Sequence, residues 1–182
     1  LAISPSLFGD VVDYLHDAQL LKRWEEGDEF WQRVVVEKPF GHDLQSASLL
    51  NNHLLRHARE RQIFRIDHYL GKETVQNIMM FRFSNAIFEQ LWNRETIEHV
   101  QITVGETVGV GGRGGYFEEA GTIRDMMQNH LLQILSLVAM EPPPSLAAED
   151  VRGEKVKALK SIRAMTPEDV AERVVSCLLY TS

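Results

Sequence analysis

Cysteine is scarce in this sequence, and its scarcity excludes whole classes of architecture. Cys177 is the one cysteine in 182 residues, so neither a disulfide framework nor a cysteine-rich zinc site is possible. No apolar run reaches the roughly 20 residues of a membrane-spanning helix, because the most apolar stretch, Leu131–Met140, has only the length of a core helix. Basic residues number 19 against 26 acidic ones. The resulting net charge of −7 offers no electrostatic support for a nucleic-acid partner.

The two ends of the sequence are unusual. The chain begins at Leu1 rather than at a methionine, so we expect a fragment whose N-terminal part is missing, and targeting stays open. Residues 177–182 resemble a translated sequencing adapter, and we expect a non-native tail there.

The composition, 44% hydrophobic and 25% charged, is ordinary for a soluble protein. The length suffices for one good core or for parts of two domains.

Helix-like and strand-like patterns alternate in the first third of the chain. Apolar residues at helical spacing from Phe8 onward predict a helix that starts near Ser6. Arg33–Val36 and Ile63–Ile66 are predicted to be buried strands, and a helix capped by Asp43 is predicted between them, up to about Arg61. This rhythm is typical of a doubly wound α/β sheet. Residues 1–66 are therefore predicted to be the C-terminal part of a Rossmann-like domain.

The rhythm changes near residue 67, where a second domain is predicted over residues 67–176. Its predicted elements are a mixed apolar helix over Thr74–Leu91, a half-buried antiparallel strand over Ile97–Glu106, a long helix over Thr122–Met140 and a charged helix over Asp150–Lys160. This order indicates the first part of an α+β domain with a mainly antiparallel sheet. Gly109–Gly114 matches the dinucleotide fingerprint G-x-G-x-x-G, but no parallel strand follows and Tyr116–Glu119 intervenes, so a mobile glycine loop is predicted instead.

Arg65–Glu73 concentrates an acid, an imidazole, a phenol and an ammonium group at the exit of a predicted strand. Open α/β sheets place their ligands at such exits. If a helix starts near Asp67, His68 and Lys72 share one face and can bind an anion such as a phosphate. Gly71 keeps the backbone bare beside them. The alternative interpretation is a helix cap followed by solvated charges.

Two further residues and one histidine pair have both a chemical and a structural interpretation. Lys38 follows the other predicted strand and can reach a ligand oxygen, or it is a surface lysine in a turn. The peptide bond between Lys38 and Pro39 can be cis or trans. His130 lies in an apolar helical stripe, which is the usual setting of a core histidine, although Asp125 lies on the same helix. His53 and His57 form an i,i+4 pair, but without a third ligand nearby no metal site is predicted.

Four segments resemble the glucose-6-phosphate dehydrogenase family, in the family's order and at its spacing. They are Val36–Gly41 (VEKPFG), Arg65–Glu73 (RIDHYLGKE), Gly112–Phe117 (GRGGYF) and Arg124–His130 (RDMMQNH). The resemblance runs from Leu1 to about Ile162. At its start, Ser4 replaces the first proline of a family L-A-x-P-P segment.

The resemblance implies oxidation of glucose 6-phosphate to 6-phosphogluconolactone with hydride transfer to NADP, the first step of the oxidative pentose phosphate pathway. It implies His130 as the general base at the C1 hydroxyl and Asp67 as the group that orients it. The other implied roles are phosphate binding by His68, Tyr69 and Lys72, binding of sugar hydroxyls by Glu106 and Asp125, and contact with both substrate and coenzyme by Lys38.

Some points rest on the resemblance alone. The residues do not distinguish NADP from NAD, since the glycine turn that cradles the coenzyme phosphates is absent. A homodimer or homotetramer and a cytoplasmic or plastid location are expected from the family. Two other readings stay open: a truncated non-catalytic relative that binds a sugar phosphate or assembles with a partner, and a structural α/β piece with solvated charges.

Overall fold

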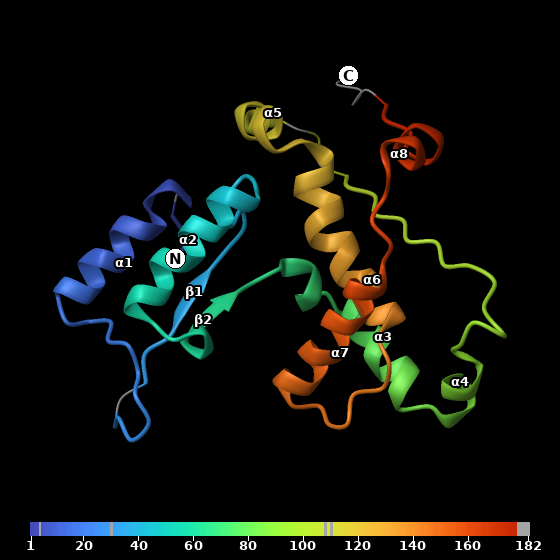
Figure 1. Cartoon of the computed structure of the whole chain (residues 1–182), viewed down its shortest axis with the longest axis horizontal. Helices are drawn as coiled ribbons and strands as arrows, with labels where there is room; N and C mark the ends of the chain where they lie inside the picture. The colour runs from blue at the N-terminus through green and yellow to red at the C-terminus, as the bar shows by residue number, and fades with distance from the viewer. Residues whose placement is uncertain (4, 30, 108, 110, 178–182) are drawn as a thin grey trace. The chain divides into compact units, whose positions relative to one another are not determined.

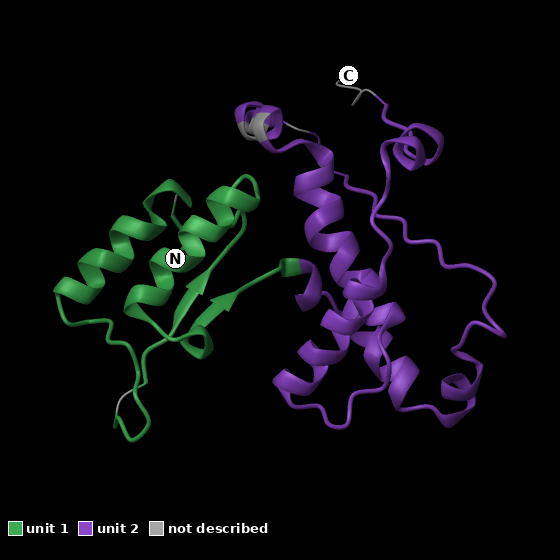
Figure 2. Ribbon diagram, viewed as in Figure 1, with its two compact units in different colours: residues 1–68 green, residues 69–182 purple. Residues whose placement is uncertain are grey.

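The chain folds as two compact units, Leu1–His68 and Tyr69–Ser182, which Figure 2 shows in green and purple. The computed structural model describes residues 1–3, 5–29, 31–107, 109 and 111–177. Leu178–Ser182, most of the expected non-native tail, lie outside the described residues. None of the described helices has both the length and the apolar character needed to cross a membrane.

The first unit contains a strand–helix–strand repeat preceded by a helix. Its elements are α1 (Phe8–Asp17), β1 (Val34–Val36), α2 (Leu44–His57) and β2 (Ile63–Arg65), with short 3₁₀ turns at Pro5–Leu7 and Glu60–Gln62 (Figure 1). β1 and β2 pair in parallel, Val34 beside Ile63 and Val36 beside Arg65. Parallel neighbours need a crossover connection, which α2 supplies. The local arrangement is therefore the βαβ unit that the sequence predicts.

The sequence predicts two buried strands, but only one face of each is buried. Val34, Val36 and Ile63 join the core with residues of both helices and of the segments that follow them: Phe8, Val12, Leu21, Leu54 and Ala58. Val35 and its register partner Phe64 are each 41% exposed. Alternate side chains of a strand point to opposite faces, and among the described residues α1 and α2 cover one of them.

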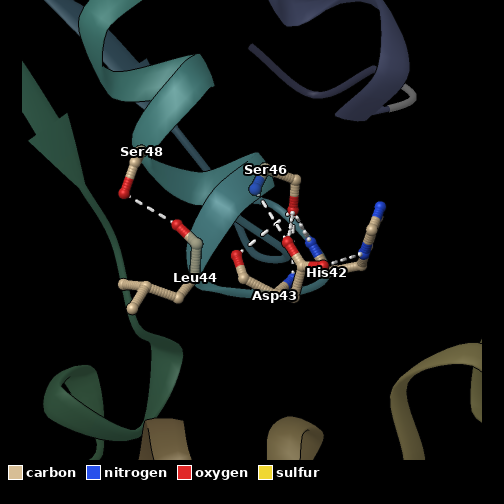
Figure 3. A network of polar contacts seen from close by, with 5 residues as sticks. All are labelled: His42, Asp43, Leu44, Ser46 and Ser48. Atoms are coloured by element: carbon tan, nitrogen blue, oxygen red, sulfur yellow. Dashed lines mark hydrogen bonds and ion pairs between the residues drawn. The ribbon is translucent and has the colours of Figure 1, made fainter.

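α2 begins at a capping box, which Figure 3 shows. The Asp43 carboxylate accepts a hydrogen bond from the Ser46 backbone N–H at 2.7 Å, and the Ser46 hydroxyl accepts one from the Asp43 backbone N–H at 3.0 Å. These bonds satisfy donors that the first helical turn leaves without partners. The predicted cap is thus confirmed. α2 ends at His57, earlier than the predicted Arg61, because Ala58 adopts an extended backbone.

A buried glutamine holds the loops beside this core. The Gln62 side chain is completely buried, and its Oε1 accepts hydrogen bonds from the backbone N–H groups of Trp24 and Arg59, both at 2.8 Å. Its Nε2 donates to the carbonyls of Lys22 and Gln32, both at 3.0 Å. The amide therefore uses both donors and accepts two bonds, so its burial carries no unpaired polar group.

The second unit is helical in the described residues. Its elements are α3 (Glu73–Phe83), α4 (Ala86–Leu91), α5 (Gly114–Thr122), a π-helical stretch (Ile123–Leu131), α6 (Leu132–Ala139), α7 (Ala148–Ser161) and α8 (Pro167–Arg173), with 3₁₀ turns at His68–Gly71 and Gly111–Arg113. Val75, Leu137 and Met140 form its buried apolar centre, around which α3, α6 and α7 pack. The predicted fold class is thus confirmed only in its coarser form: the described residues combine helices with one parallel pair of strands, β1 and β2.

A buried arginine joins α3 to the end of α6. Arg82 donates hydrogen bonds to the carbonyls of Leu137 at 2.6 Å and Met140 at 2.8 Å. These carbonyls lie where a helix leaves its last acceptors unpaired and carries partial negative charge. Burial lowers the pKa of the Arg82 guanidinium, while nearby Glu141 raises it. The side chain therefore works as a charged cap on α6.

The predicted antiparallel strand is not formed. Residues 97–106 adopt neither helix nor strand, and no described strand forms a ladder with them. Alternation of apolar and polar residues suits a strand, but a strand exists only when a neighbour takes its N–H and C=O groups. The mainly antiparallel sheet is likewise not seen among the described residues.

The long helices of the second unit also differ from their predictions. The expected helix over Thr74–Leu91 breaks at Ser84 and Asn85, where the Asn85 amide donates to the carbonyls of Met80 and Phe81 at 3.3 and 3.1 Å. Such residues favour helix ends over helix interiors. In the expected helix over Thr122–Met140, Ile123 and Met127 are 62% and 50% exposed, whereas His130 is completely buried and Ile134 packs against the core. The π-helical winding over Ile123–Leu131 changes the angle between successive side chains.

Candidate active site

Two predicted site residues follow the parallel strands of the first unit. Lys38 stands two residues beyond Val36. Asp67 stands two residues beyond Arg65, which is the register partner of Val36. The pairing continues one step past β2, because the Ile66 N–H donates to the Val36 carbonyl at 3.0 Å. Lys38 and Asp67 therefore leave the sheet at the same, carboxyl-terminal edge, where open α/β sheets bind ligands. Both side chains are half-buried, and the bond between Lys38 and Pro39 is cis.

The signature segment Arg65–Glu73 does not open a helix at Asp67 as predicted. His68–Gly71 form a 3₁₀ turn, and α3 begins only at Glu73. The α-helical geometry that was to place His68 and Lys72 on one face is thus wrong. His68 is exposed at the end of the first unit, and Lys72 is the exposed N-cap residue of α3.

Tyr69 is the centre of the site in the second unit. Its side chain is buried, and its ring stacks on the imidazole of His130 with a centroid distance of 4.1 Å and an interplanar angle of 22°. The Tyr69 hydroxyl donates a hydrogen bond to the Glu106 carboxylate. The Lys72 ammonium lies 3.5 Å from the centroid of the Tyr69 ring. One phenol therefore brings together an imidazole, a carboxylate and a cation from three separate segments.

His130 and Asp125 lie on the same π-helical stretch. A π-helix joins residue i to residue i+5, so Asp125 and His130 stand about one turn apart, closer to a common face than α-helical winding allows. His130 is completely buried and Asp125 is half-buried. The second unit thus gathers an imidazole, a carboxylate and an ammonium group around one phenol, and it carries a second carboxylate on the helix of the imidazole: His130, Glu106, Lys72, Tyr69 and Asp125.

The glycine motif does not form a coenzyme fingerprint, although its turn opens directly into a helix, contrary to the prediction. Gly111–Arg113 form a 3₁₀ turn, and α5 starts directly at Gly114, so nothing intervenes before the helix. The predicted glycine loop is therefore helical from Gly111 onward, while Val110 lies outside the described residues. The strand that a fingerprint requires before its turn is missing from the described residues.

Comparison with known proteins identifies the family. Residues 1–77 match the family described as "Glucose-6-phosphate dehydrogenase, NAD binding domain", and residues 79–179 match "Glucose-6-phosphate dehydrogenase, C-terminal domain". The chain belongs to the glucose-6-phosphate dehydrogenase family. This membership confirms the resemblance carried by the four sequence segments.

The relatives are similar over nearly all of this chain. Glucose-6-phosphate 1-dehydrogenase of Rhizobium meliloti (strain 1021) is 51% identical over 175 residues, 96% of this chain and 34% of its own length. The chloroplastic enzyme of Solanum tuberosum is 55% identical over 170 residues, 93% of this chain and 28% of its own. A solved glucose-6-phosphate dehydrogenase in complex with its substrate glucose-6-phosphate has a TM-score of 0.78 at 51% identity, over 88% of this chain and 32% of that one. The chain thus spans about a third of the relatives it matches.

A further group of titratable side chains was not foreseen as a group. His53 and His57 of α2 both contact Asp13 of α1, forty residues away in the sequence from His53. The hydrogen bond from His53, followed by the charge of the two imidazoles, holds the pKa of Asp13 below its ordinary value against the raising effect of burial. The i,i+4 histidine spacing was visible in the sequence, but the third partner depends on how the two helices pack.

Proposed function

We propose that this chain supplies sugar-binding and catalytic residues of an NADP-dependent glucose-6-phosphate dehydrogenase. The observation that carries the proposal is the group around Tyr69, where the imidazole of His130, the carboxylate of Glu106 and the ammonium of Lys72 meet one buried ring. The family membership directs this group toward a phosphorylated sugar. The product would be 6-phosphogluconolactone, in the first step of the oxidative pentose phosphate pathway.

The proposed division of labour follows from the chemistry of the groups. His130 takes the proton of the C1 hydroxyl, since an imidazole titrates near neutral pH. Its stack on Tyr69 fixes the ring plane. Asp67 orients the imidazole and stabilises the imidazolium that forms. Glu106 and Asp125 accept hydrogen bonds from sugar hydroxyls, and the negative charge of the two carboxylates strengthens these bonds.

The phosphate end of the sugar is assigned to His68, Tyr69 and Lys72. Lys72 supplies a cation at the N-terminus of α3, where the helix dipole also favours an anion. Tyr69 can donate a hydrogen bond in addition to its structural role. A phosphate anchored away from C1 provides binding energy that positions the reacting carbon.

The coenzyme is assigned to the edge of the β1–β2 sheet. Lys38 lies at the carboxyl-terminal edge, where it would contact both the sugar and the nicotinamide end of NADP. NADP, when bound, accepts the hydride from C1 of the sugar. The first unit, residues 1–66, would then be part of the coenzyme domain, and residues 67–176 part of the substrate and dimerisation domain. A homodimer or homotetramer and a cytoplasmic location are proposed from the family resemblance alone, and a plastid location from the chloroplastic relatives.

The phosphate assignment has a direct test in a chimera in which this chain replaces the matching segment of the Rhizobium meliloti enzyme. Lys72→Thr should weaken binding of glucose 6-phosphate by about 1.5–3 kcal/mol, roughly ten- to a hundredfold in KM, because a charge-assisted contact is lost. Binding of unphosphorylated glucose should change little. Lys160→Thr, which removes the same charge from the end of α7, serves as the control.

Two results would count against the assignments. An equal loss of affinity for both sugars would mean that Lys72 does not face the phosphate. A chimera that binds glucose 6-phosphate tightly but never reduces NADP would favour the alternative, a non-catalytic relative that binds a sugar phosphate or assembles with a partner.

A further inference from the structure

Two helices of the first unit bring three metal-ligating side chains to one point. His53 Nε2 lies 2.7 Å and His57 Nε2 lies 2.8 Å from the same carboxylate oxygen, Oδ1 of Asp13. One ligand atom from each of the three residues lies within 4.8 Å of the other two. None of them belongs to the residues assigned to the sugar or the coenzyme.

The arrangement is set by helix geometry. His53 and His57 are one turn apart on α2, so both rings project from one face toward α1. α1 carries Gly9 opposite them, and a Cβ atom there would lie 3.2 Å from Cε1 of His53. The bare backbone of α1 therefore leaves room for the imidazole. Phe8, Val12 and Leu54 pack α1 and α2 into one core, so the ligands are held by a packed frame.

The donors and their exposure suit a transition-metal ion. Imidazole nitrogen and carboxylate oxygen are ligands of zinc, with metal–ligand distances of about 2.0–2.2 Å. Tetrahedral coordination at those distances separates ligand atoms by about 3.3–3.6 Å, so each histidine nitrogen must withdraw from the carboxylate by roughly 0.5–0.9 Å. The side chains are 20–40% exposed, which permits both this adjustment and access for an ion.

We propose that Asp13, His53 and His57 form a zinc-binding site that ties α1 to α2. The three side chains supply three ligands, and water takes the fourth position, as is common where protein ligands are three. His16 positions His57 without being a ligand: the centroids of their rings lie 4.4 Å apart, and Nδ1 of His16 lies 3.2 Å from the Leu21 carbonyl oxygen. The site is independent of the proposed dehydrogenase function.

The test is zinc titration of the 182-residue chain by calorimetry. The parent protein should carry Cys177→Ser, because the exposed thiol of Cys177 is a competing zinc ligand. One zinc ion per chain should bind, and its addition should raise the Tm. His57→Gln and Asp13→Asn should each weaken zinc binding at least about tenfold and abolish the rise in Tm. Asp13→Asn keeps an oxygen that accepts hydrogen bonds from the histidines, so it is the variant more certain to fold.

His42→Gln is the matched control, since His42 precedes the same helix, is exposed and takes no part in the cluster. It should bind zinc as the parent does. Circular dichroism should show the parent's helix content in each variant used, and if His57→Gln does not fold, Asp13→Asn decides. Absence of stoichiometric zinc binding by the parent, or unchanged affinity in Asp13→Asn, would overturn the proposal.

Discussion

At the scale of single residues, His130 is the group on which the proposed chemistry depends most. It is completely buried and stacked on Tyr69, so its ring is held before substrate binds. In the chimera, His130→Asn should lower kcat by roughly 10²–10⁴, the usual worth of a general base. KM should change little, because asparagine keeps a hydrogen-bonding side chain. Steady-state kinetics of NADPH formation measure both constants, and a variant that retains most of its turnover would refute the role.

Gln62 is the residue on which the first unit's stability should depend. Gln62→Ala removes four hydrogen bonds and leaves backbone groups of the surrounding loops unpaired. The free energy of unfolding should fall by about 2–4 kcal/mol, since each buried unsatisfied group carries a desolvation penalty. Urea denaturation measures the change. Gln45→Ala, an exposed glutamine of α2, should stay within about 0.5 kcal/mol of the parent.

At the scale of elements, α8 should be the helix most sensitive to acid. Its N-terminus is a capping box of Thr166 and Asp169, and Arg163 donates to both Asp169 oxygens at 2.7 and 3.0 Å. The hydrogen bond from Arg163, then that from the Thr166 backbone, holds the pKa of Asp169 below its ordinary 3.8. Because the folded pKa is lowered, the stabilisation is complete above the unfolded pKa and is lost as pH falls through the folded one.

We therefore expect α8 to unwind as the pH falls below the ordinary Asp value of 3.8, as followed by the NMR chemical shifts of its backbone. Asp169→Asn should remove most of this pH dependence and loosen α8 at neutral pH. Glu172→Gln, on the same helix but exposed, should keep the parent's profile. An identical acid transition in Asp169→Asn would show that another group controls it.

At the scale of the whole molecule, the 182-residue chain by itself should bind NADP weakly and should not turn over. Positioning of the hydride acceptor supplies much of a dehydrogenase's rate, and the coenzyme pyrophosphate normally rests on a glycine turn between a strand and a helix. The chain's match to that fingerprint, Gly109–Gly114, follows no strand in the described residues. Calorimetry with NADP and an NADPH absorbance assay test this, with the chimera as the active control. Tight binding by the chain alone would refute it.

Local signals in the sequence were sufficient for several elements. They predicted the helix cap at Asp43, the buried strand that contains β1 and the end of a helix near Met140 without knowledge of the rest of the fold. α8 was missed, although Thr166, Pro167 and Asp169 form a readable helix start. The four family segments identified the family because they preserve residue types and spacing, both of which are properties of the sequence.

The sequence by itself determined the elements with local causes, the family and the set of candidate residues: Lys38, Asp67, His68, Tyr69, Lys72, Glu106, Asp125 and His130. Only the tertiary structure decided which groups meet. It stacked Tyr69 on His130, brought Glu106 to the Tyr69 hydroxyl and placed Asp13 against His53 and His57. It also left residues 97–106 outside any helix or strand. The physical reason is that helix caps and turns use hydrogen bonds between near neighbours, whereas strand pairing, ring stacking and ligand clusters depend on segments that packing brings together.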